Sequence, residues 1–332
     1  MPNIAIVSTA HIHTKGFLER LAQIPDARVY AIWDDIVERG QKYAATSGAT
    51  FIPTLARLLR DKNVDAYMIC SENTRHLPLL KKVLKAGKPV FCDKPLCTTV
   101  KDLQKIAALH KEYPAPLFCG YFHPFEGTMQ AAAKLVRDGT FGKITRVRYR
   151  NAHHAAYGRW FDSPDLQWFC NPEFSGGGAF MDMGTHSVHL LRTLFGPVTE
   201  VWATIGNQSG IYPTVDDFGI AHLKFASGIV GTAEAAWTQT GGIGGLEIVG
   251  SEQSLWNNGE QYVIGSPGKK SAPIVSLPGK PTRVDRLVAI LKGDVTKEEL
   301  DADLAAIMDS VAIMEAAYKS SRSGRWANVA AV

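Results

Sequence analysis

The first residues with chemical potential are two histidines in the stretch STAHIH, residues 8–13. An apolar strand, Ile4–Val7, leads into this turn, and a helix follows it. Histidines at positions i and i+2 after a strand can provide two ligands of a metal-dependent hydrolase. The same turn reads G-x-G-x-x-G in dinucleotide-binding proteins, and here Ser8, Ala10 and His13 take the glycine positions. The turn by itself leaves open a metal pair, a nucleotide turn and a plain loop.

An acidic residue at the end of the next strand favours the nucleotide turn. Asp34 directly follows the strand-like run Arg28–Trp33, close to the acidic position expected about 20 residues after the turn. Its carboxylate can accept a hydrogen bond from a ribose 2′-hydroxyl and would repel a 2′-phosphate, which predicts NAD rather than NADP. Ser8 and Ala10 are small, and the helix N-terminus after them still offers N–H groups and a positive dipole end to a phosphate.

A lysine follows a later strand-like run. Lys94 lies in Asp93-Lys94-Pro95, directly after the run Pro89–Cys92. A residue that precedes proline is held extended, so we expect the amine to point beyond the sheet edge. Ligands bind at the carboxyl ends of parallel strands, which makes this lysine a candidate functional residue. A solvated turn lysine is the alternative that this stretch leaves open.

The first 120 residues alternate between short apolar runs and helical patterns, which predicts βαβ units and a parallel sheet. One helical pattern, from about His76, ends at Gly87, a helix-terminating residue. Another contains Leu55, Leu58 and Leu59. The strand-like runs are Ile4–Val7, Arg28–Trp33, Ala66–Cys70, Pro89–Cys92 and Leu117–Gly120.

After about residue 123 the pattern changes to strands with one apolar face, which predicts a mainly antiparallel sheet. Ser227-Gly228 is typical of a hairpin turn. A helical stripe over about 297–322 ends before Gly324. Antiparallel strands are incompatible with a (β/α)₈ hydrolase barrel, so the metal hypothesis becomes the least favoured. The strands are expected within residues 143–154, 198–207, 216–238 and 244–258.

Composition limits the class of protein. The 332 residues suit two domains, and a net charge of +4 is too mild to indicate a nucleic-acid partner. The chain has no secretory leader pattern and no apolar run of about 18 residues, so we expect a cytoplasmic protein without a membrane partner. The five cysteines show no C-x-x-C spacing and are expected to be free thiols.

With the run FSGGGAFMDMGTHSVHLLRTLFG, residues 174–196, the stretch around Lys94 resembles the Gfo/Idh/MocA family of glucose–fructose oxidoreductase, inositol dehydrogenase and rhizopine catabolism proteins. Further shared features are H-x-P-x-L-x-x-x-L-x-A-G-K-P-V from His76, GKI at 142–144 and the closing AIMEAAYKSSRSGRW. The resemblance covers nearly the whole chain. It implies a Rossmann-like NAD(P)-binding domain over residues 1–122 and an α+β domain with an open-faced sheet over residues 123–332. It also implies homo-oligomers, dimers or tetramers, that form through those sheets.

The resemblance also implies catalytic roles. Lys94 matches the family's active-site lysine, and Asp182 and His186 match the aspartate and histidine of its catalytic group. We expect His186 to remove the hydroxyl proton as hydride leaves for the nicotinamide. We expect Asp182 to orient His186, and Lys94 to stabilise negative charge on the same oxygen. The alternative that Asp182 and His186 only cap a helix stays open.

Departures from the family pattern mark a divergent branch. Asp93 is one methylene shorter than the usual glutamate, which predicts a weakened or water-mediated contact to the nicotinamide ribose. His189 stands where many members carry a second aspartate. The glycines of the nucleotide turn are missing as well.

The expected binding residues form two groups, with no metal ligands among them. Aromatic rings with interleaved polar groups suit a sugar, and Arg159 is a candidate partner for an acidic substituent. The expected cofactor contacts are Ser8, Thr9, Ala10, His11, Ile12, Asp34, Ser71, Asn73, His76, Asp93 and Lys94. The expected substrate contacts are Tyr121, His123, His153, Tyr157, Arg159, Trp160 and Trp168.

The sequence therefore predicts an NAD-dependent oxidoreductase that acts on a sugar, polyol or related carbohydrate hydroxyl. A redox glycosidase that recycles NAD in place is the first alternative. A non-catalytic, dinucleotide-binding regulatory protein is the second, and a metal-dependent hydrolase is the last.

Overall fold

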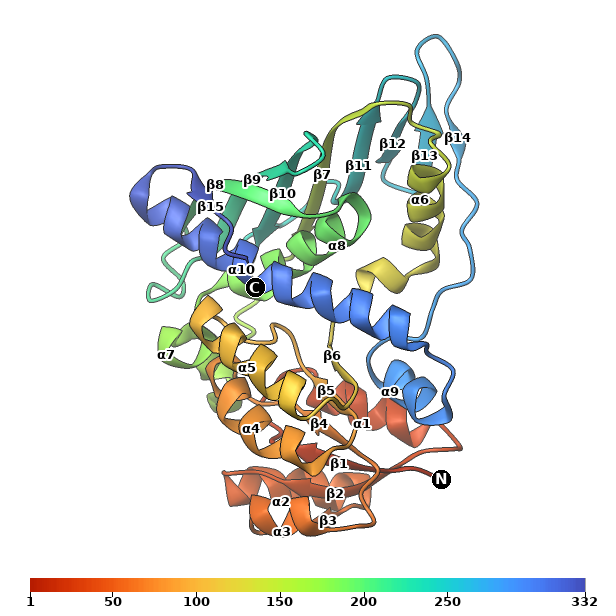
Figure 1. Ribbon diagram of the computed structural model, residues 1–332. Helices are drawn as coiled ribbons and strands as arrows, with labels where there is room; N and C mark the ends of the chain where they lie inside the picture. Colours follow the sequence, from red (N-terminus) through yellow and green to blue (C-terminus); the bar gives the residue numbers. More distant parts are fainter. Residues whose placement is uncertain (332) are drawn as a thin grey trace.

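The computed structural model of the protein describes residues 1–331 and contains two β-sheets (Figure 1). One sheet lies at the N-terminal end of the molecule, and the other lies above it with helices α8 (Thr185–Phe195) and α10 (Lys297–Ser323) in between. Within residues 1–331, no helix is both long and apolar enough to span a bilayer.

The N-terminal sheet is parallel, with strand order β3-β2-β1-β4-β5-β6. All five predicted strands are confirmed within two residues at each end, and β3 is an additional two-residue strand. The strands are β1 (Asn3–Val7), β2 (Arg28–Trp33), β3 (Thr50–Phe51), β4 (Ala66–Ile69), β5 (Val90–Cys92) and β6 (Leu117–Cys119). The connecting helices are α1 (Thr14–Ala22), α2 (Val37–Ser47), α3 (Leu55–Arg60), α4 (His76–Val83) and α5 (Val100–Glu112).

This strand order creates a crevice beside the end of β1. The chain turns to β2 on one side of β1 and crosses to β4 on the other, and ligands bind at such switch points in open α/β sheets. Strands β1 and β4 are buried along nearly their whole length, as expected for apolar strands covered on both faces. The bulk of His13 does not lift α1 off the sheet, because Phe17, Leu18 and Leu21 of that helix are buried in the core.

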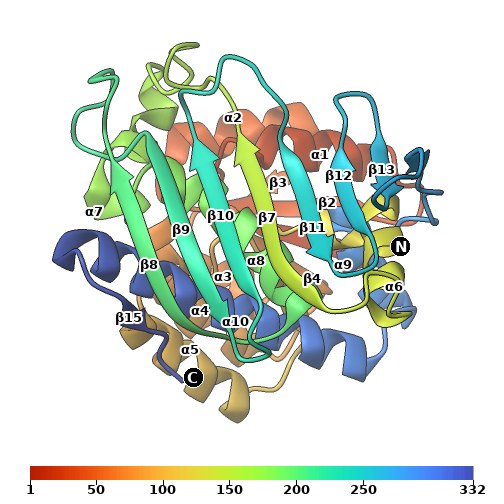
Figure 2. The ribbon, with the colours of Figure 1, turned by 90° about the horizontal axis from the view of Figure 1, so that it is seen from above.

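The C-terminal sheet is mixed and mainly antiparallel, with order β14-β13-β12-β11-β7-β10-β9-β8-β15 (Figure 2). Only β7 and β10 pair in parallel. The predicted hairpin is confirmed between β9 and β10, with Gly228 at a φ of +87°. The strands are β7 (Ile144–Ala152), β8 (Val198–Gly206), β9 (Phe218–Phe225), β10 (Val230–Ala236), β11 (Gly245–Gly250), β12 (Ser254–Asn257), β13 (Tyr262–Gly265), β14 (Ala272–Pro273) and β15 (Ala327–Asn328).

One face of this sheet is buried and the other is open. Val147, Ala221 and Ala233 belong to the buried face, which packs with α8 and α10 in a second core. Figure 2 looks onto the opposite face, which no helix covers within residues 1–331. Arg148, on the open face, lies within ion-pair distance of Glu234 and Glu247 on the two flanking strands.

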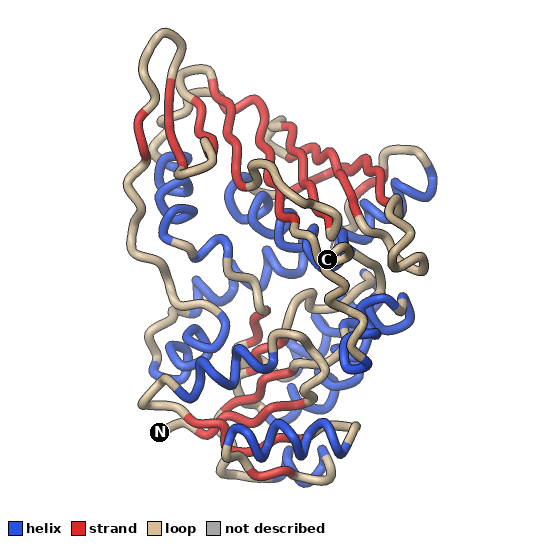
Figure 3. Tube along the Cα trace, turned by 180° about the vertical axis from the view of Figure 1, so that it is seen from behind, coloured by secondary structure: helices blue, strands red, loops and turns tan. Residues whose placement is uncertain are grey.

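The two halves share residues of the C-terminal helices. Val284 and Leu287 of α9 (Arg283–Lys292) and Leu304 of α10 pack into the core of the parallel sheet. Figure 3 shows from behind how the chain runs from β14 down to α9. The remaining helices are α6 (Gly127–Arg137) and α7 (Pro172–Ser175).

The triple-glycine run is held by one partly buried carboxylate. Asp216 accepts hydrogen bonds from the N–H groups of Gly178 and Phe180, at 2.8 and 2.7 Å, and from the Tyr318 hydroxyl at 2.9 Å. A Cβ atom on Gly178 would overlap the carbonyl oxygen of Asp216. Glycine is therefore required at this position for a steric reason.

We expect Gly178→Ala to lower the free energy of unfolding by about 3 kcal/mol, because the overlap is with backbone that cannot move aside. Urea denaturation measures the change. Gly241→Ala is the control, since its Cβ meets no atom within 4 Å, and it should stay within about 0.5 kcal/mol of the wild type. Equal stability of the two variants would contradict the steric account.

Candidate active site

A cavity of about 270 Å³ lies between the two halves and contains the three predicted catalytic residues. Lys94 enters it from the end of β5, Asp182 from the π-helical turn Phe180–Gly184, and His186 from the first turn of α8. The lining residues are Ile12, His13, Lys94, Phe122, Asn151, His153, Trp160, Phe161, Phe169, Asp182, Met183, His186 and Arg283.

Lys94 and Asp182 form a buried ion pair. The ammonium Nζ lies 2.5 Å from Asp182 Oδ1 and donates a second hydrogen bond to the Asp182 carbonyl at 3.1 Å. The Trp237 indole N–H donates to the other carboxylate oxygen at 2.9 Å. Burial alone would raise the pKa of Asp182, but the charge of Lys94 and its hydrogen bond lower it to about 2.

Asp182 does not orient His186, contrary to the sequence expectation. Its two oxygens are taken by Lys94 and Trp237, and a cationic ammonium is a stronger partner for a carboxylate than a neutral imidazole. His186 Nδ1 is buried and has no hydrogen-bond partner within residues 1–331. Burial, followed by the charge of Lys94, lowers the pKa of His186 well below 6.5, so the ring is neutral at pH 7.

The two histidines of the opening turn both bind Asp93. His11 Nδ1 lies 2.8 Å and His13 Nδ1 3.1 Å from Asp93 Oδ2, and the Lys94 N–H donates to Oδ1 at 2.8 Å. Burial would raise the pKa of Asp93, but the two histidines and their hydrogen bonds hold it well below 3.8. The three ligand atoms lie within 4.8 Å of one another, a donor set that zinc accepts. The same geometry is also explained without a metal, because the Nδ1–H groups of His11 and His13 can both donate hydrogen bonds to the Asp93 carboxylate.

The opening turn keeps donors free for a pyrophosphate. Ser8 has a φ of +66°, and the N–H groups of Ser8 and His11 bond to the carbonyls of Trp33 and Cys70. The N–H groups of Ala10 and Ile12 donate no hydrogen bond within residues 1–331. These groups and the positive N-terminal end of α1 are what a dinucleotide turn offers to phosphate, so the turn fits NAD without glycines.

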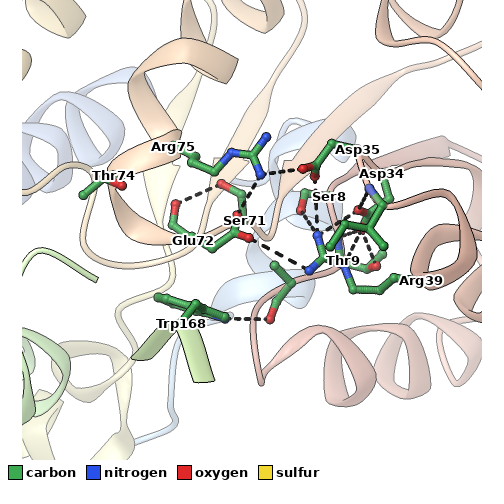
Figure 4. Close-up of polar contacts among 12 residues, drawn as sticks. Ser8, Thr9, Asp34, Asp35, Arg39, Ser71, Glu72, Thr74, Arg75 and Trp168 are labelled. Carbon is green, nitrogen blue, oxygen red and sulfur yellow. Dashed lines mark hydrogen bonds and ion pairs between the residues drawn. The ribbon is translucent and has the colours of Figure 1, made fainter. Parts of the chain in front are cut away.

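The carboxylate of Asp34 is already saturated (Figure 4). It accepts from the Thr9 N–H and hydroxyl at 2.7 and 2.6 Å, from the Ile36 N–H at 2.8 Å, and from Arg39 Nη2 and Nε at 2.8 and 3.0 Å. A ribose hydroxyl would share this carboxylate with these donors or displace one of them, and the predicted ribose contact of Asp34 stays a prediction. The neighbouring Asp35 is 29% exposed and pairs with Arg75 at 2.5 Å.

Three other predicted cofactor residues follow β4, with His76 as the first residue of α4, and their side chains contact backbone carbonyls of the protein. His76 is fully buried, with Nδ1 2.7 Å from the Pro95 carbonyl, and burial lowers its pKa. Ser71 bonds to the Glu72 carbonyl, and Asn73 donates to the Ser175 carbonyl at 2.9 Å. His76 therefore links the segments that follow β4 and β5 and does not line the cavity, and its cofactor contact stays a prediction.

The predicted substrate residues divide between the cavity and its surroundings. His153 and Trp160 line the cavity, with ring centroids 4.7 Å apart. Trp168 lies at the nucleotide turn instead, where its indole N–H donates to the Ala10 carbonyl at 3.1 Å. His123 packs edge-on against His186, at 5.4 Å, but does not line the cavity.

Three predicted substrate residues do not line this cavity, and their assignment stays a prediction. Tyr121 is 1% exposed, and its hydroxyl bonds to Thr185 at 2.6 Å. Tyr157 is half exposed outside the cavity lining. Arg159 is paired with Asp162 at 2.8 Å and does not line the cavity either.

Sequence reasoning missed several residues of the site, among them Phe122, Asn151 and Arg283 of the cavity lining and Trp237, which donates to Asp182. Trp237 directly follows β10, and Asn151 is the second-to-last residue of β7. A search of the carboxyl ends of strands in the second half of the chain would have found both. Arg283 is separated from every motif, and nothing in its neighbouring sequence marks it.

The buried His11, which contacts Asp93, predicts that the free energy of unfolding depends on pH. Burial, the largest effect, lowers the pKa of His11 from 6.5 to about 4 despite the charge of Asp93. Between these pH values the unfolded chain binds a proton that the folded protein does not, so stability falls as the pH falls from 6.5 to 4. Over this pH range, protonation of His11 in the unfolded chain lowers the free energy of unfolding by roughly 3 kcal/mol.

His11→Gln should remove this part of the slope when urea denaturation is repeated across that pH range. The variant keeps an N–H donor for Asp93 but cannot be protonated. His186 and His189 add a fall of the same sign that remains in the variant. Identical slopes for the wild type and the variant would show that His11 titrates normally.

Comparison with known proteins adds independent findings. Residues 3–121 match the model of an oxidoreductase family with an NAD-binding Rossmann fold, and residues 129–256 match the GFO/IDH/MocA C-terminal domain. The 1,5-anhydro-D-fructose reductase of Ensifer adhaerens is 28% identical over 68% of this chain and 67% of its own length. The myo-inositol 2-dehydrogenase of Thermotoga maritima is 29% identical over 65% of this chain and 63% of its own.

Solved structures share the fold along the whole chain. A levoglucosan dehydrogenase in complex with NADH superposes with a TM-score of 0.83 at 19% identity and covers 100% of both chains. GenD2 from gentamicin A biosynthesis, in complex with NAD, gives 0.78 at 24% identity over 99% of this chain and 97% of its own. The two family models together account for both halves of the molecule. The chain therefore belongs to the Gfo/Idh/MocA family of oxidoreductases with an NAD-binding Rossmann fold.

Proposed function

We propose that this protein oxidises a hydroxyl-bearing carbon of a sugar, polyol or related carbohydrate with NAD. One observation carries the proposal: Lys94, Asp182 and His186 line a single cavity beside the nucleotide turn, although they come from different halves of the chain. The similarity to a reductase of 1,5-anhydro-D-fructose and a dehydrogenase of myo-inositol supports a carbohydrate substrate.

The chemistry divides between two residues and a bound cofactor. NAD, when bound, supplies the acceptor for the hydride. The neutral His186 accepts the proton of the substrate hydroxyl. Lys94, held by Asp182, donates a hydrogen bond to the same oxygen and stabilises the negative charge that develops there. Asp182 positions Lys94 rather than His186.

We propose that the cofactor contacts the turn Ser8–Ile12, the carboxylates that follow β2, and Asp93 with Lys94. Residues 1–122 form the cofactor-binding domain in this proposal, and residues 123–332 form the substrate and oligomerisation domain. The open face of the C-terminal sheet, with its alternating arginines and glutamates, is the proposed surface for a homodimer or homotetramer. A cytoplasmic location agrees with the buried free cysteines.

A redox glycosidase is the second candidate, because the same cavity chemistry can oxidise a glycoside transiently. It differs in its products, since NAD would be regenerated in place. A binding-only regulatory role is less favoured, because it would not require the buried Lys94–Asp182 pair. The hydrolase candidate rests on the His11, His13 and Asp93 donor set, and stoichiometric zinc in the purified protein would favour it.

We expect Lys94→Ala to lower kcat by about 100- to 1,000-fold on the sugar that the wild type oxidises, because the developing charge loses its donor. The measurement is the rate of NADH formation. Lys134→Ala, at a lysine that is 56% exposed, should retain wild-type turnover. Full turnover in Lys94→Ala would remove this residue from the mechanism.

The charges after β2 predict selectivity for NAD over NADP. Asp34, Asp35 and Glu72 face Arg39 and Arg75, which leaves a net charge of −1 from three carboxylates and two guanidinium groups. This charge repels a 2′-phosphate.

Asp35→Asn removes one carboxylate and leaves Arg75 with Glu72 as its only acidic partner, so the ratio of the NADP to the NAD dissociation constant should fall about tenfold. Titration calorimetry with both cofactors measures the ratio. Asp138→Asn, at a distant exposed carboxylate, is the control and should leave it unchanged. An unchanged ratio in Asp35→Asn would show that the selectivity has another source.

A further inference from the structure

Arg283 is a cation in the candidate active site that the mechanism does not use. It lines the cavity together with Lys94, Asp182 and His186. Its Nε donates to the Gly120 carbonyl at 3.1 Å, and its guanidinium lies 4.0 Å from the centre of the Phe122 ring. Its two Nη groups form no hydrogen bond and no ion pair within residues 1–331.

The charges of the cavity wall do not cancel. Lys94 and Asp182 neutralise each other as an ion pair, so Arg283 leaves one positive charge without a partner among the fully charged lining residues. The nearest acidic side chains are already engaged. Asp93 and Glu126 keep their negative charges and raise the pKa of Arg283 from a distance, but neither forms an ion pair with it: Asp93 lies against His11 and His13, and Glu126 against His123.

Burial makes this unpaired charge costly. The largest effect on Arg283 is desolvation, which lowers its pKa, although guanidinium stays protonated at pH 7. Taking a cation out of water costs free energy unless an anion or several acceptors compensate it. An anion brought into the cavity would recover this free energy.

The backbone holds Arg283 in place. Its φ of +51° is a left-handed conformation that costs a non-glycine residue of order 1–3 kcal/mol. The segment before it is fixed by backbone hydrogen bonds from Leu277 to Gly127 and from Lys280 to Phe125. The guanidinium is thus presented with its Nη edge free and its position set in advance. Such preorganisation lowers the entropy cost of binding an oxyanion with two hydrogen bonds.

We infer that Arg283 binds an oxyanion on the substrate, so that the protein acts on acidic sugars. This inference rests on the proposed carbohydrate oxidation and names its substrate class. A carboxylate or a phosphate on a sugar offers the same pair of acceptor oxygens to the Nη edge. Arg159, the sequence-based candidate for this role, already has Asp162 as its partner.

The test compares matched sugars on the NAD-loaded enzyme. D-glucuronate and D-glucose 6-phosphate are each compared with D-glucose, and D-galacturonate with D-galactose. Binding is measured by calorimetry in the presence of cofactor, and NADH formation is measured in parallel. We expect the wild type to bind at least one acid about 10- to 100-fold more tightly than its neutral partner. The two acid classes distinguish a carboxylate from a phosphate.

Arg283→Met should abolish the preference for the acid while it changes binding of the neutral sugar and of NAD less than about threefold, because only the charged hydrogen bonds are lost. Arg283→Lys keeps the positive charge but loses the pair of Nη donors that can bind an oxyanion with two hydrogen bonds, so it should retain part of the preference. Arg20→Met is the control, since Arg20 is half exposed and paired with Asp285.

Several results overturn the inference. No preference for either acid in the wild type does so, with or without turnover. A loss of NAD affinity above tenfold in Arg283→Met assigns the arginine to the cofactor pyrophosphate instead. Selective loss of the acid preference in Arg159→Met would return the role to that residue. Turnover of neutral sugars without acid preference refutes only the role of Arg283, whereas binding of acids without any NADH formation refutes the proposed oxidation.

Discussion

The buried ion pair between Lys94 and Asp182 is the interaction on which the site depends. Lys94 belongs to the carboxyl edge of the parallel sheet, and Asp182 belongs to the turn that precedes α8 under the second sheet. Each charge is shielded from water, so neither would be stable without the other. Trp237, from the end of β10, completes the coordination of the carboxylate. The pair therefore fixes how the two halves meet and aims the ammonium at the cavity between them.

The departures at the nucleotide turn form one coupled arrangement. Two family-atypical features, histidines in a glycine-poor turn and an aspartate where a glutamate is usual, contact each other directly. The shorter carboxylate of Asp93 is reached by both imidazoles, which pack with ring centroids 4.5 Å apart. The turn thus keeps its free N–H donors, while its two histidines bind Asp93 at the end of the neighbouring strand β5. This arrangement answers what His11 and His13 do: they hold Asp93.

Patterns formed by residues close together in the sequence were predictable, and contacts between residues far apart in the sequence were not. Apolar runs gave the parallel strands, and Gly87 and Gly228 marked a helix end and a hairpin correctly. The motif around Lys94 and the run from Gly176 to His186 indicated the catalytic group. Which carboxylate meets which cation depends on tertiary packing, so the predicted contact of Asp182 with His186 was wrong, and the pairing of Asp34 with Arg39 was not foreseen. Arg283 lies about 100 residues beyond His186 and outside every motif, and only the folded chain brings it to the cavity.

The central claim is that this cavity transfers hydride from a carbohydrate carbon to NAD. The most direct measurement uses a sugar carrying deuterium at its hydroxyl-bearing carbons, followed by mass spectrometry of the NADH that forms. The account predicts that the reduced cofactor gains one deuterium, and that the wild type transfers it while Lys94→Ala does so far more slowly. Conversion of the sugar with no deuterium in the cofactor pool would contradict the account.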